Sequence, residues 1–306
     1  MKVAALDLGS NTFLCLIAEV ENSQITKIYH DSVESVRLGQ ELSKNKKFHS
    51  EALLRADKCL QEFSKIIKQH QPEHVLAMAT SAARDAENKE QLFAIAEKYN
   101  IPLEVIPGDK EASITYKGAV SAQGSEPTQR MVIDIGGGST EFIFGHGLQL
   151  LVGKSLDIGC VRLTEKFIST QPTSNDEIEK VSSYIQLALQ EVIKLKPANF
   201  KVEQILAVAG TPTAIAAAEM GGFVAEKIDG YKLTEKSLNT WLSKLQGATI
   251  EEKIKMGLPA GRADVIIIGV ITLLQTLKAF DLSDIIVSTR GVRYGVALEI
   301  FNRYRS

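Results

Sequence analysis

A run of glycines flanked by two acidic residues is the segment of this sequence best suited to chemistry. Residues Asp134–Glu141 read Asp-Ile-Gly-Gly-Gly-Ser-Thr-Glu. Because glycine has no Cβ, the backbone N–H groups of Gly136, Gly137 and Gly138 can approach a ligand closely, and successive N–H groups form a concave anion site. Ser139 would add a hydroxyl donor. The segment predicts a phosphate-binding loop, and the alternative is a tight hairpin turn with polar side chains.

The two carboxylates of this segment, on Asp134 and Glu141, are candidate ligands for a metal ion. Magnesium prefers oxygen ligands and commonly bridges protein carboxylates and substrate phosphates. We therefore expect Mg²⁺ or another divalent cation as the cofactor.

A second segment near the start of the chain has the same design. Leu6–Thr12 and Ile133–Thr140 each follow an apolar strand, place an aspartate at its end, turn through glycine and hydroxyl residues, and enter another apolar strand. Ser10 and Asn11 lie in the first of these turns and are candidate phosphate ligands. Two like domains that each begin with this hairpin would place two Asp-Gly loops opposite each other across a cleft.

Other phosphate and hydrolase motifs have little support. Gly153–Ser155 resembles the end of a P-loop, but the preceding glycine, Gly147, leaves five intervening residues where the motif has four. Moreover, Leu148–Asp157 is expected to be a strand. His70 and His74 are separated by a proline, which prevents one helix face from presenting both to a metal. Hydrolysis by an activated water is the chemistry that remains.

The elements that must position these loops alternate between strands and helices, which is typical of an α/β fold. The predicted strands are Val3–Leu6, Phe13–Val20, Val75–Ala79, Leu103–Ile106, Met131–Ile135, Glu141–Phe144, Ile205–Ala209 and Ile285–Val287. The predicted helices are Ser50–Gln69, Lys89–Tyr99, Lys110–Ser121, Asp176–Lys194 and Asp264–Ala279. A chain of 306 residues is long for one core and short for three, so we expect two domains. The polar, turn-forming stretch Gln123–Gln129 is the predicted boundary between them.

Composition and charge narrow the class of protein. A net charge of −2 argues against a broad basic face that binds nucleic acid, so the positive charge for a polyanionic ligand must be local. The apolar stretch Val265–Leu274 is too short to span a bilayer, and the N-terminus lacks the apolar core of a signal peptide. Cys15, Cys59 and Cys160 show no Cys-x-x-Cys spacing, which predicts buried thiols in a reducing cytoplasm.

The order and spacing of several short motifs resemble the Ppx/GppA phosphatase family, which belongs to the actin, sugar kinase and Hsp70-like superfamily. Any one of these motifs would be weak support, whereas their order and spacing together are highly specific, and they run along nearly the whole chain. The motifs are Asp7–Thr12, Arg37–Gly39, Ala79–Asn88, Glu111–Ala112, Tyr116–Gly118, Asp134–Glu141, Gly159–Glu165, Gly210–Thr213, Gly261–Ile266 and Gly291–Arg293.

The resemblance implies a fold and a reaction. The fold is α/β, with two ribonuclease H-like domains of the actin-like ATPase superfamily flanking a cleft, at about 1–124 and 125–306, and a last helix at about 292–303 that can pack back on the first domain. The reaction is removal of a terminal phosphate from inorganic polyphosphate or guanosine pentaphosphate (pppGpp) by water, with Mg²⁺ neutralising charge. The general base of the family matches Glu111, for which the alternative role is a first-turn charge that complements a helix dipole.

The resemblance also points to phosphate ligands outside the glycine loop. Arg84 lies in a strand-to-helix turn and matches a phosphate-binding position of the family, although helix capping or an ion pair would be an alternative role. Gly210 and Thr211 follow a predicted strand and complete the predicted phosphate ligands. Arg37 and Arg262 fit functional and structural roles equally well.

Two further residues are expected to be structural, and three other features depart from the family pattern. Arg162 and Trp241 are expected to be structural. Lys110 stands where an acidic residue usually precedes the glutamate, which would alter metal or substrate preference, and Tyr294 replaces an aspartate of the family pattern. The helical region that follows the catalytic domains of longer members is absent, so we expect less surface for holding a long polymer.

Two other functions share these features. A kinase or ATPase of the same superfamily would use the paired hairpins and a loop at Gly210–Thr213 on the adenosine side, but it would need an acceptor pocket. A non-catalytic nucleotide or phosphate sensor would not need Glu111 as a base. The sequence leaves open the choice between polyphosphate and pppGpp, the identity of the metal, and whether the protein forms a homodimer.

Overall fold

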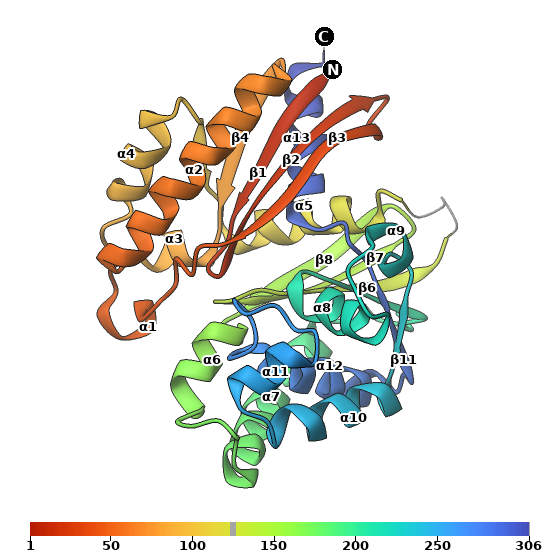
Figure 1. The fold of residues 1–306 in the computed structure, drawn as a ribbon. Coiled ribbons are helices and arrows are strands. Elements are labelled where there is room, and N and C mark those ends of the chain that lie inside the picture. Colours follow the sequence, from red (N-terminus) through yellow and green to blue (C-terminus); the bar gives the residue numbers. More distant parts are fainter. Residues whose placement is uncertain (123–126, 306) are drawn as a thin grey trace. The chain divides into compact units, whose positions relative to one another are not determined.

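The structure, a computed structural model, describes residues 1–122 and 127–305. The chain divides into two compact units (Figure 1). The first unit comprises Met1–Gln123 and Gly291–Ser306, and the second comprises Gly124–Arg290. The predicted boundary at Gln123–Gln129 lies partly outside the described residues, and the last segment of the chain belongs to the first unit.

The first unit is built on a mixed five-stranded sheet with strand order β3-β2-β1-β4-β5. In this sheet β1 pairs antiparallel with β2 and parallel with β4. The strands are β1 (Lys2–Leu8), β2 (Thr12–Glu21), β3 (Gln24–Ser35), β4 (His74–Ala79) and β5 (Leu103–Val105). The helices are α1 (Leu42–Asn45), α2 (Ser50–His70), α3 (Ser81–Asp85), α4 (Glu90–Lys98), α5 (Gly108–Val120) and α13 (Val292–Tyr304).

The central strand β1 is buried on both faces. Leu6 and Leu8 join a core cluster that also contains side chains of α2 and α4. Val3 and Ala5, which point to the opposite face, join a second cluster with side chains of α5 and α13. Because successive side chains of a strand alternate between faces, a strand covered on both sides must be apolar throughout, and this explains its sequence.

The second unit repeats this topology and adds one strand. Its strand order, β10-β11-β9-β6-β7-β8, matches that of the first sheet from β11 to β8, with the same parallel and antiparallel pairings. The strands are β6 (Gln129–Ile135), β7 (Thr140–His146), β8 (Gln149–Leu156), β9 (Gln204–Val208), β10 (Lys232–Thr234) and β11 (Asp284–Val287). The helices are α6 (Cys160–Phe167), α7 (Asn175–Leu195), α8 (Gly210–Glu219), α9 (Ala225–Ile228), α10 (Glu235–Gln246), α11 (Ile250–Lys255) and α12 (Ile266–Phe280).

The core of the second unit lies on one face of this sheet. Side chains of β6 pack there against α7, where Val181, Ile185 and Leu189 follow one another at the spacing of a helix turn. Trp241 of α10 is buried in the same cluster, as expected for a structural residue, and its indole N–H donates to Glu219 at 2.9 Å.

The predicted elements and the predicted α/β class are confirmed. Each predicted strand and helix is present, and Gly153–Ser155 lies in strand β8 rather than in a P-loop. Strand β3 escapes prediction from the apolar pattern because most of its side chains are exposed. All three cysteines are buried and free, and burial raises the pKa of the Cys15 thiol to about 12. None of the helices in the described ranges is long and apolar enough to cross a bilayer.

Helices α5 and α13 approach each other closely at two glycines. Figure 1 shows α13, in blue, beside α5 and β1, although these segments are far apart in the sequence. A Cβ on Gly295 would lie 2.0 Å from the carbonyl oxygen of Ile114, and one on Gly118 would lie 2.2 Å from that of Gly291. The contact requires glycine at both positions, and through it α13 fixes the helix that carries Glu111.

We expect Gly295→Ala to destabilise the protein by about 1–3 kcal/mol, because the added methyl group meets backbone rather than a movable side chain. The matched control is Gly222→Ala, since a Cβ on Gly222 meets nothing within 4 Å. Urea unfolding of both variants measures the effect. Equal stability of G295A and G222A would show that the two helices do not depend on this contact.

Candidate functional site

The turn between β1 and β2 is held by backbone hydrogen bonds on both sides. The N–H of Gly9 donates to the carbonyl of Thr12 at 3.0 Å and closes the turn. The carbonyl of Ser10 accepts from Gly39, and that of Asn11 accepts from Val36 and from the N–H of Arg37. Ser10 and Asn11 are both buried, and the irregular segment at 36–39, which follows β3, holds the backbone of these predicted phosphate ligands in place.

The Ser10 side chain lies next to the start of helix α3. Its hydroxyl is 2.9 Å from the hydroxyl of Ser81, the first residue of that helix. Because α3 follows directly after β4, which neighbours β1, the topology brings the turn and the helix start together. Ser10 therefore lies one helical turn from Arg84, which is also in α3.

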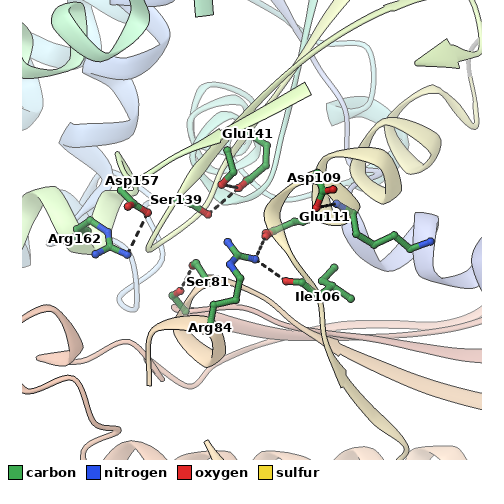
Figure 2. A network of polar contacts seen from close by, with 12 residues as sticks. Ser81, Arg84, Ile106, Asp109, Glu111, Ser139, Glu141, Asp157 and Arg162 are labelled. Carbon is green, nitrogen blue, oxygen red and sulfur yellow. Dashed lines mark hydrogen bonds and ion pairs between the residues drawn. The ribbon is translucent and has the colours of Figure 1, made fainter. Parts of the chain in front are cut away.

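Arg84 and Glu111 form an ion pair within the first unit. Nη1 of Arg84 donates to Oε2 of Glu111 at 2.6 Å and to the carbonyl of Ile106 at 3.0 Å, as Figure 2 shows. Glu111 lies in the first turn of α5, and its side chain is 7% exposed. The structure thus joins the predicted base and one predicted phosphate ligand through a direct contact.

The protonation of Glu111 is set by two opposing effects. Burial raises the pKa of the Glu111 carboxyl above its ordinary value, and the Arg84 guanidinium opposes that shift. A carboxyl whose pKa lies above its usual range is a better proton acceptor than an exposed glutamate at the same pH. The environment of Glu111 is therefore suited to a general base.

Lys110, the neighbour of Glu111, points to a different part of the unit. Its amine lies 2.8 Å from a carboxylate oxygen of Glu299 in α13, and Lys117 approaches the same carboxylate at 3.5 Å. Tyr294, the other departure from the family pattern, donates its hydroxyl to Asp31 at 3.0 Å. Both departures therefore contribute contacts that attach α13 to the rest of the first unit.

The turn between β6 and β7 repeats the closure of the first hairpin but carries different side chains. The N–H of Gly136 donates to the carbonyl of Ser139 at 3.0 Å. Asp134 stands directly opposite Glu141 across the two strands, whereas the residue opposite Asp7 in the first hairpin is Leu14. Side chains that face each other across an antiparallel pair are close neighbours, so only the second hairpin pairs two carboxylates at this register.

Two hydroxyl groups orient the Glu141 carboxylate. Oε1 of Glu141 accepts from the hydroxyl of Ser139 at 2.8 Å, as Figure 2 shows, and from that of Ser155 at 2.6 Å. Asp134 and Glu141 are both buried. A site of this kind supplies two carboxylates at the mouth of a glycine loop, which suits Mg²⁺ because that ion keeps several ligands for water and substrate phosphates. Within the described ranges no three His, Cys, Asp or Glu side chains form a protein-only metal cage.

The carbonyl groups of the glycine loop point toward helix α6. The carbonyl of Gly136 accepts from the N–H of Cys160 at 2.9 Å, and that of Gly137 accepts from Val161 at 2.8 Å and from the N–H of Arg162 at 3.1 Å. In a trans peptide the carbonyl and the following N–H point in opposite directions. The N–H groups of Gly137 and Gly138 are therefore directed away from α6, as a phosphate cradle requires.

The start of α8 is occupied by protein side chains. The guanidinium of Arg262 packs against the Cα of Gly210, where a Cβ would lie 1.7 Å from Cζ. Burial lowers the pKa of the Arg262 guanidinium, and Asp134 is close enough to oppose this shift. The Thr211 hydroxyl lies 3.7 Å from Sγ of Cys160 inside the unit. The structure therefore brings Arg262 to the Asp134 end of β6, and the Thr211 side chain is buried against Cys160.

The sequence analysis missed two residues that support the site. Ser155 is the residue of β8 directly opposite Glu141 in the sheet, so strand register would have indicated it. Ser81 begins a helix immediately after a buried strand, which is a position where hydroxyl residues commonly approach anions. The signal at Ser155 becomes readable only when the strand pairing is known.

The two units share one sheet order, and each has an aspartate followed by a glycine turn at the end of its first strand. This repeated arrangement defines the chain as a protein of the actin-like ATPase superfamily, built from ribonuclease H-like domains. Comparison with known sequences narrows the class. The chain belongs to the Ppx/GppA phosphatase family, whose sequence pattern it matches over residues 16–304, and the predicted family is confirmed.

Named relatives and solved structures agree with this assignment. The chain is 30% identical over 315 residues to exopolyphosphatase 2 of Mycobacterium tuberculosis, with 98% of both chains covered. It is 38% identical over 310 residues to a bifunctional 3-dehydroquinate synthase/phosphatase of Fusobacterium nucleatum, covering 97% of this chain but 46% of that protein, so it spans about half of that relative.

Two solved structures extend the likeness to the fold. An exopolyphosphatase from Cytophaga hutchinsonii matches with a TM-score of 0.89 and 28% identity, covering 99% of this chain and 98% of that one. The Ppx/GppA family member of Aquifex aeolicus matches with a TM-score of 0.81 and 29% identity, covering 100% of this chain and 99% of that one.

Proposed function

We propose that this protein hydrolyses the terminal phosphoanhydride of inorganic polyphosphate and releases orthophosphate. The observation that carries the proposal is the buried Glu111, held 2.6 Å from Arg84 at the position that corresponds to the general base of the family. The names of relatives such as the exopolyphosphatases of M. tuberculosis and C. hutchinsonii support polyphosphate as the substrate. A 5′-triphosphate such as that of pppGpp ends in the same linkage and is the second candidate substrate.

In the proposed reaction a water molecule attacks the terminal phosphorus and Glu111 accepts its proton. The bond between that phosphorus and the bridging oxygen breaks, and the chain leaves shortened by one phosphate. Negative charge accumulates on the non-bridging oxygens during phosphoryl transfer. In the first unit Arg84 would provide a bidentate donor for a phosphate beside Glu111. In the second unit the N–H groups of the glycine loop would bind phosphate oxygens.

A bound magnesium ion would neutralise charge on the phosphates. The residues that would hold it are Asp134 and Glu141, because they are paired across the hairpin and Glu141 is already oriented by two hydroxyl groups. Ser139 and Ser155 would fix the direction of the carboxylate in the absence of the ion as well.

The Arg84–Glu111 pair couples phosphate binding to the state of the base. When Arg84 turns toward a phosphate, Glu111 loses the charge that lowers its pKa, while burial continues to raise that pKa. Of the charged side chains on α5 near it, Lys110 is bound to Glu299, and Asp109 accepts from the N–H of Lys110. The exchange would therefore make Glu111 a stronger base once substrate is present.

Two features distinguish the proposal from its rivals. A phosphate sensor has no use for a carboxyl that burial makes more basic. A kinase requires a pocket for the acceptor, whereas water needs none. Phosphate release from polyphosphate, pppGpp and ATP, measured in parallel, separates hydrolysis of inorganic chains from nucleotide-dependent activity.

We expect Glu111→Gln to reduce phosphate release by roughly 10²–10⁴-fold, because the amide keeps the shape of the side chain and cannot accept the proton. The matched control is Glu104→Gln, which changes another carboxylate of the first unit that lies 2.6 Å from an arginine, Arg303. Colorimetric phosphate release and the melting temperature are measured for both. Activity of E111Q within about threefold of wild type would remove Glu111 from the reaction.

The pH profile of activity should show whether Arg84 turns from Glu111 toward the phosphate of the substrate. Activity falls at low pH as Glu111 becomes protonated, and the raised pKa places this fall above the range of an ordinary glutamate. Because kcat reports the substrate complex and kcat/KM the free enzyme, the acid limb of kcat should lie at higher pH than that of kcat/KM. Limbs that coincide in wild type would show that Arg84 stays on Glu111 during turnover.

We expect Asp134→Asn and Glu141→Gln each to weaken Mg²⁺ binding on the order of 10-fold, since each removes one of two carboxylate ligands. Glu177→Gln is the control, because Glu177 serves a helix cap in the same unit. Isothermal titration with Mg²⁺ measures affinity without turnover, and EDTA tests the need for the ion in catalysis. Wild-type affinity in both variants would place the ion elsewhere.

A further inference from the structure

The carbonyl of Gly138, the last of the three glycines, is bound by a side chain rather than by backbone. Nε of Arg162 donates to it at 2.7 Å. The other end of the guanidinium lies 3.6 Å from Asp157, which Figure 2 shows beside it. The Arg162 side chain is 21% exposed and leaves from the first turn of α6, whose backbone N–H groups bind the two preceding carbonyls.

The internal repeat shows what is unusual about this contact. In the first hairpin the equivalent carbonyl belongs to Asn11, and it accepts from two backbone N–H groups, those of Val36 and Arg37. Backbone donors held in a packed segment are difficult to remove by mutation. In the second hairpin the same position depends on one arginine, so a single substitution can release it.

The orientation of the Gly138–Ser139 peptide follows from this contact. Since the carbonyl of Gly138 points to Arg162, the N–H of Ser139 points the opposite way, in the direction that the Gly137 and Gly138 N–H groups already take. Three consecutive glycines have wide conformational freedom, and an unrestrained loop would lose much of it on binding phosphate. An external restraint therefore matters more here than in a loop of ordinary residues.

We infer that Arg162 is a positioning residue for phosphate binding: it holds the Gly138 carbonyl so that the N–H groups of the glycine loop stay directed at the ligand. The inference rests on the proposed role of this loop in binding phosphate. Arg162 acts through the loop and is distinct from Arg84, which would contact the phosphate itself. The arginine thus supplies the binding site with pre-organisation rather than with charge.

The test compares Arg162→Met with Arg130→Met. Arg130 is a suitable control because it is also an arginine of the second unit that donates to a turn carbonyl, that of Gly147, at 3.3 Å, but at the opposite end of the β6–β7 hairpin. Three quantities are measured for each variant: residue-specific amide exchange without ligand, the affinity for inorganic phosphate by titration calorimetry, and kcat and KM with tripolyphosphate.

Two amides report on the loop: the N–H of Gly136 closes it, and the N–H of Val161 binds the Gly137 carbonyl. In R162M we expect both to exchange about 10-fold faster or more, because the loss of one charge-assisted hydrogen bond corresponds to about that factor. Phosphate affinity should fall and KM should rise by a similar factor, with kcat changed less, because the lost contact affects bound substrate and transition state alike. R130M should leave these amides and KM unchanged. Arg162→Lys, which retains one donor, should recover most of the affinity.

The outcomes separate the inference from the proposed function. Unchanged exchange at Gly136 and Val161 in R162M overturns the inference even if the protein hydrolyses polyphosphate. Faster exchange with unaltered phosphate affinity also overturns it, since the loop would then not need the restraint. Faster exchange and weaker phosphate binding in a protein that does not hydrolyse polyphosphate would support the inference and remove the proposed function.

Discussion

The ion pair between Arg84 and Glu111 places an electrostatic constraint on the first unit. A carboxylate as buried as Glu111 is costly unless a cation and further hydrogen bonds compensate it. Arg84 provides the cation, and its second bond, to the Ile106 carbonyl, fixes the junction between β5 and α5. The position of α3 next to the β1–β2 turn and the packing of α5 on α13 therefore both bear on the state of one carboxyl group.

The repeat within the chain separates what the fold dictates from what the chemistry requires. Both units use the same order of strands and close the first hairpin with the same backbone hydrogen bond. The side chains differ at the position where function would depend on them, the residue opposite the aspartate of the first strand. A carboxylate faces Asp134, whereas a leucine faces Asp7. A common scaffold with unequal loops would allow one unit to carry the proposed metal-binding pair and the other the proposed base.

Much of the fold could be predicted from the sequence because its central strands are apolar on both faces and its long helices have one apolar side. The hairpin repeat and the glycine loop were also readable, since an aspartate and a glycine that interrupt an apolar run indicate a turn at the end of a strand. Glu111 and Arg84 could be found only through resemblance: a glutamate in a first helical turn is common, and nothing local reveals that an arginine 27 residues earlier lies against it.

The remaining parts of the site depend on contacts that cross the sheet. Ser155 supports Glu141 because their strands pair in one register, and a shift of one residue would turn its hydroxyl to the other face. The prediction that Lys110 alters metal or substrate preference stays a prediction, and its contact with Glu299 was not accessible because the partner lies in the last helix. Long-range pairs of this kind have no signature in sequence spacing.

The discontinuity of the first unit has a consequence for how the chain is made. Helix α13 covers one face of the sheet in the first unit, yet it leaves the ribosome only after the whole of the second unit. Until then Val3 and Ala5, with the rest of that face, lack their cover, and the nascent first unit carries an exposed apolar surface. The second unit is continuous and can complete its core first, although chains generally fold from the N-terminal domain onward. Synthesis would therefore finish the later unit before the earlier one, and a ribosome that pauses before α13 has emerged would hold the incomplete unit where chaperones can bind it.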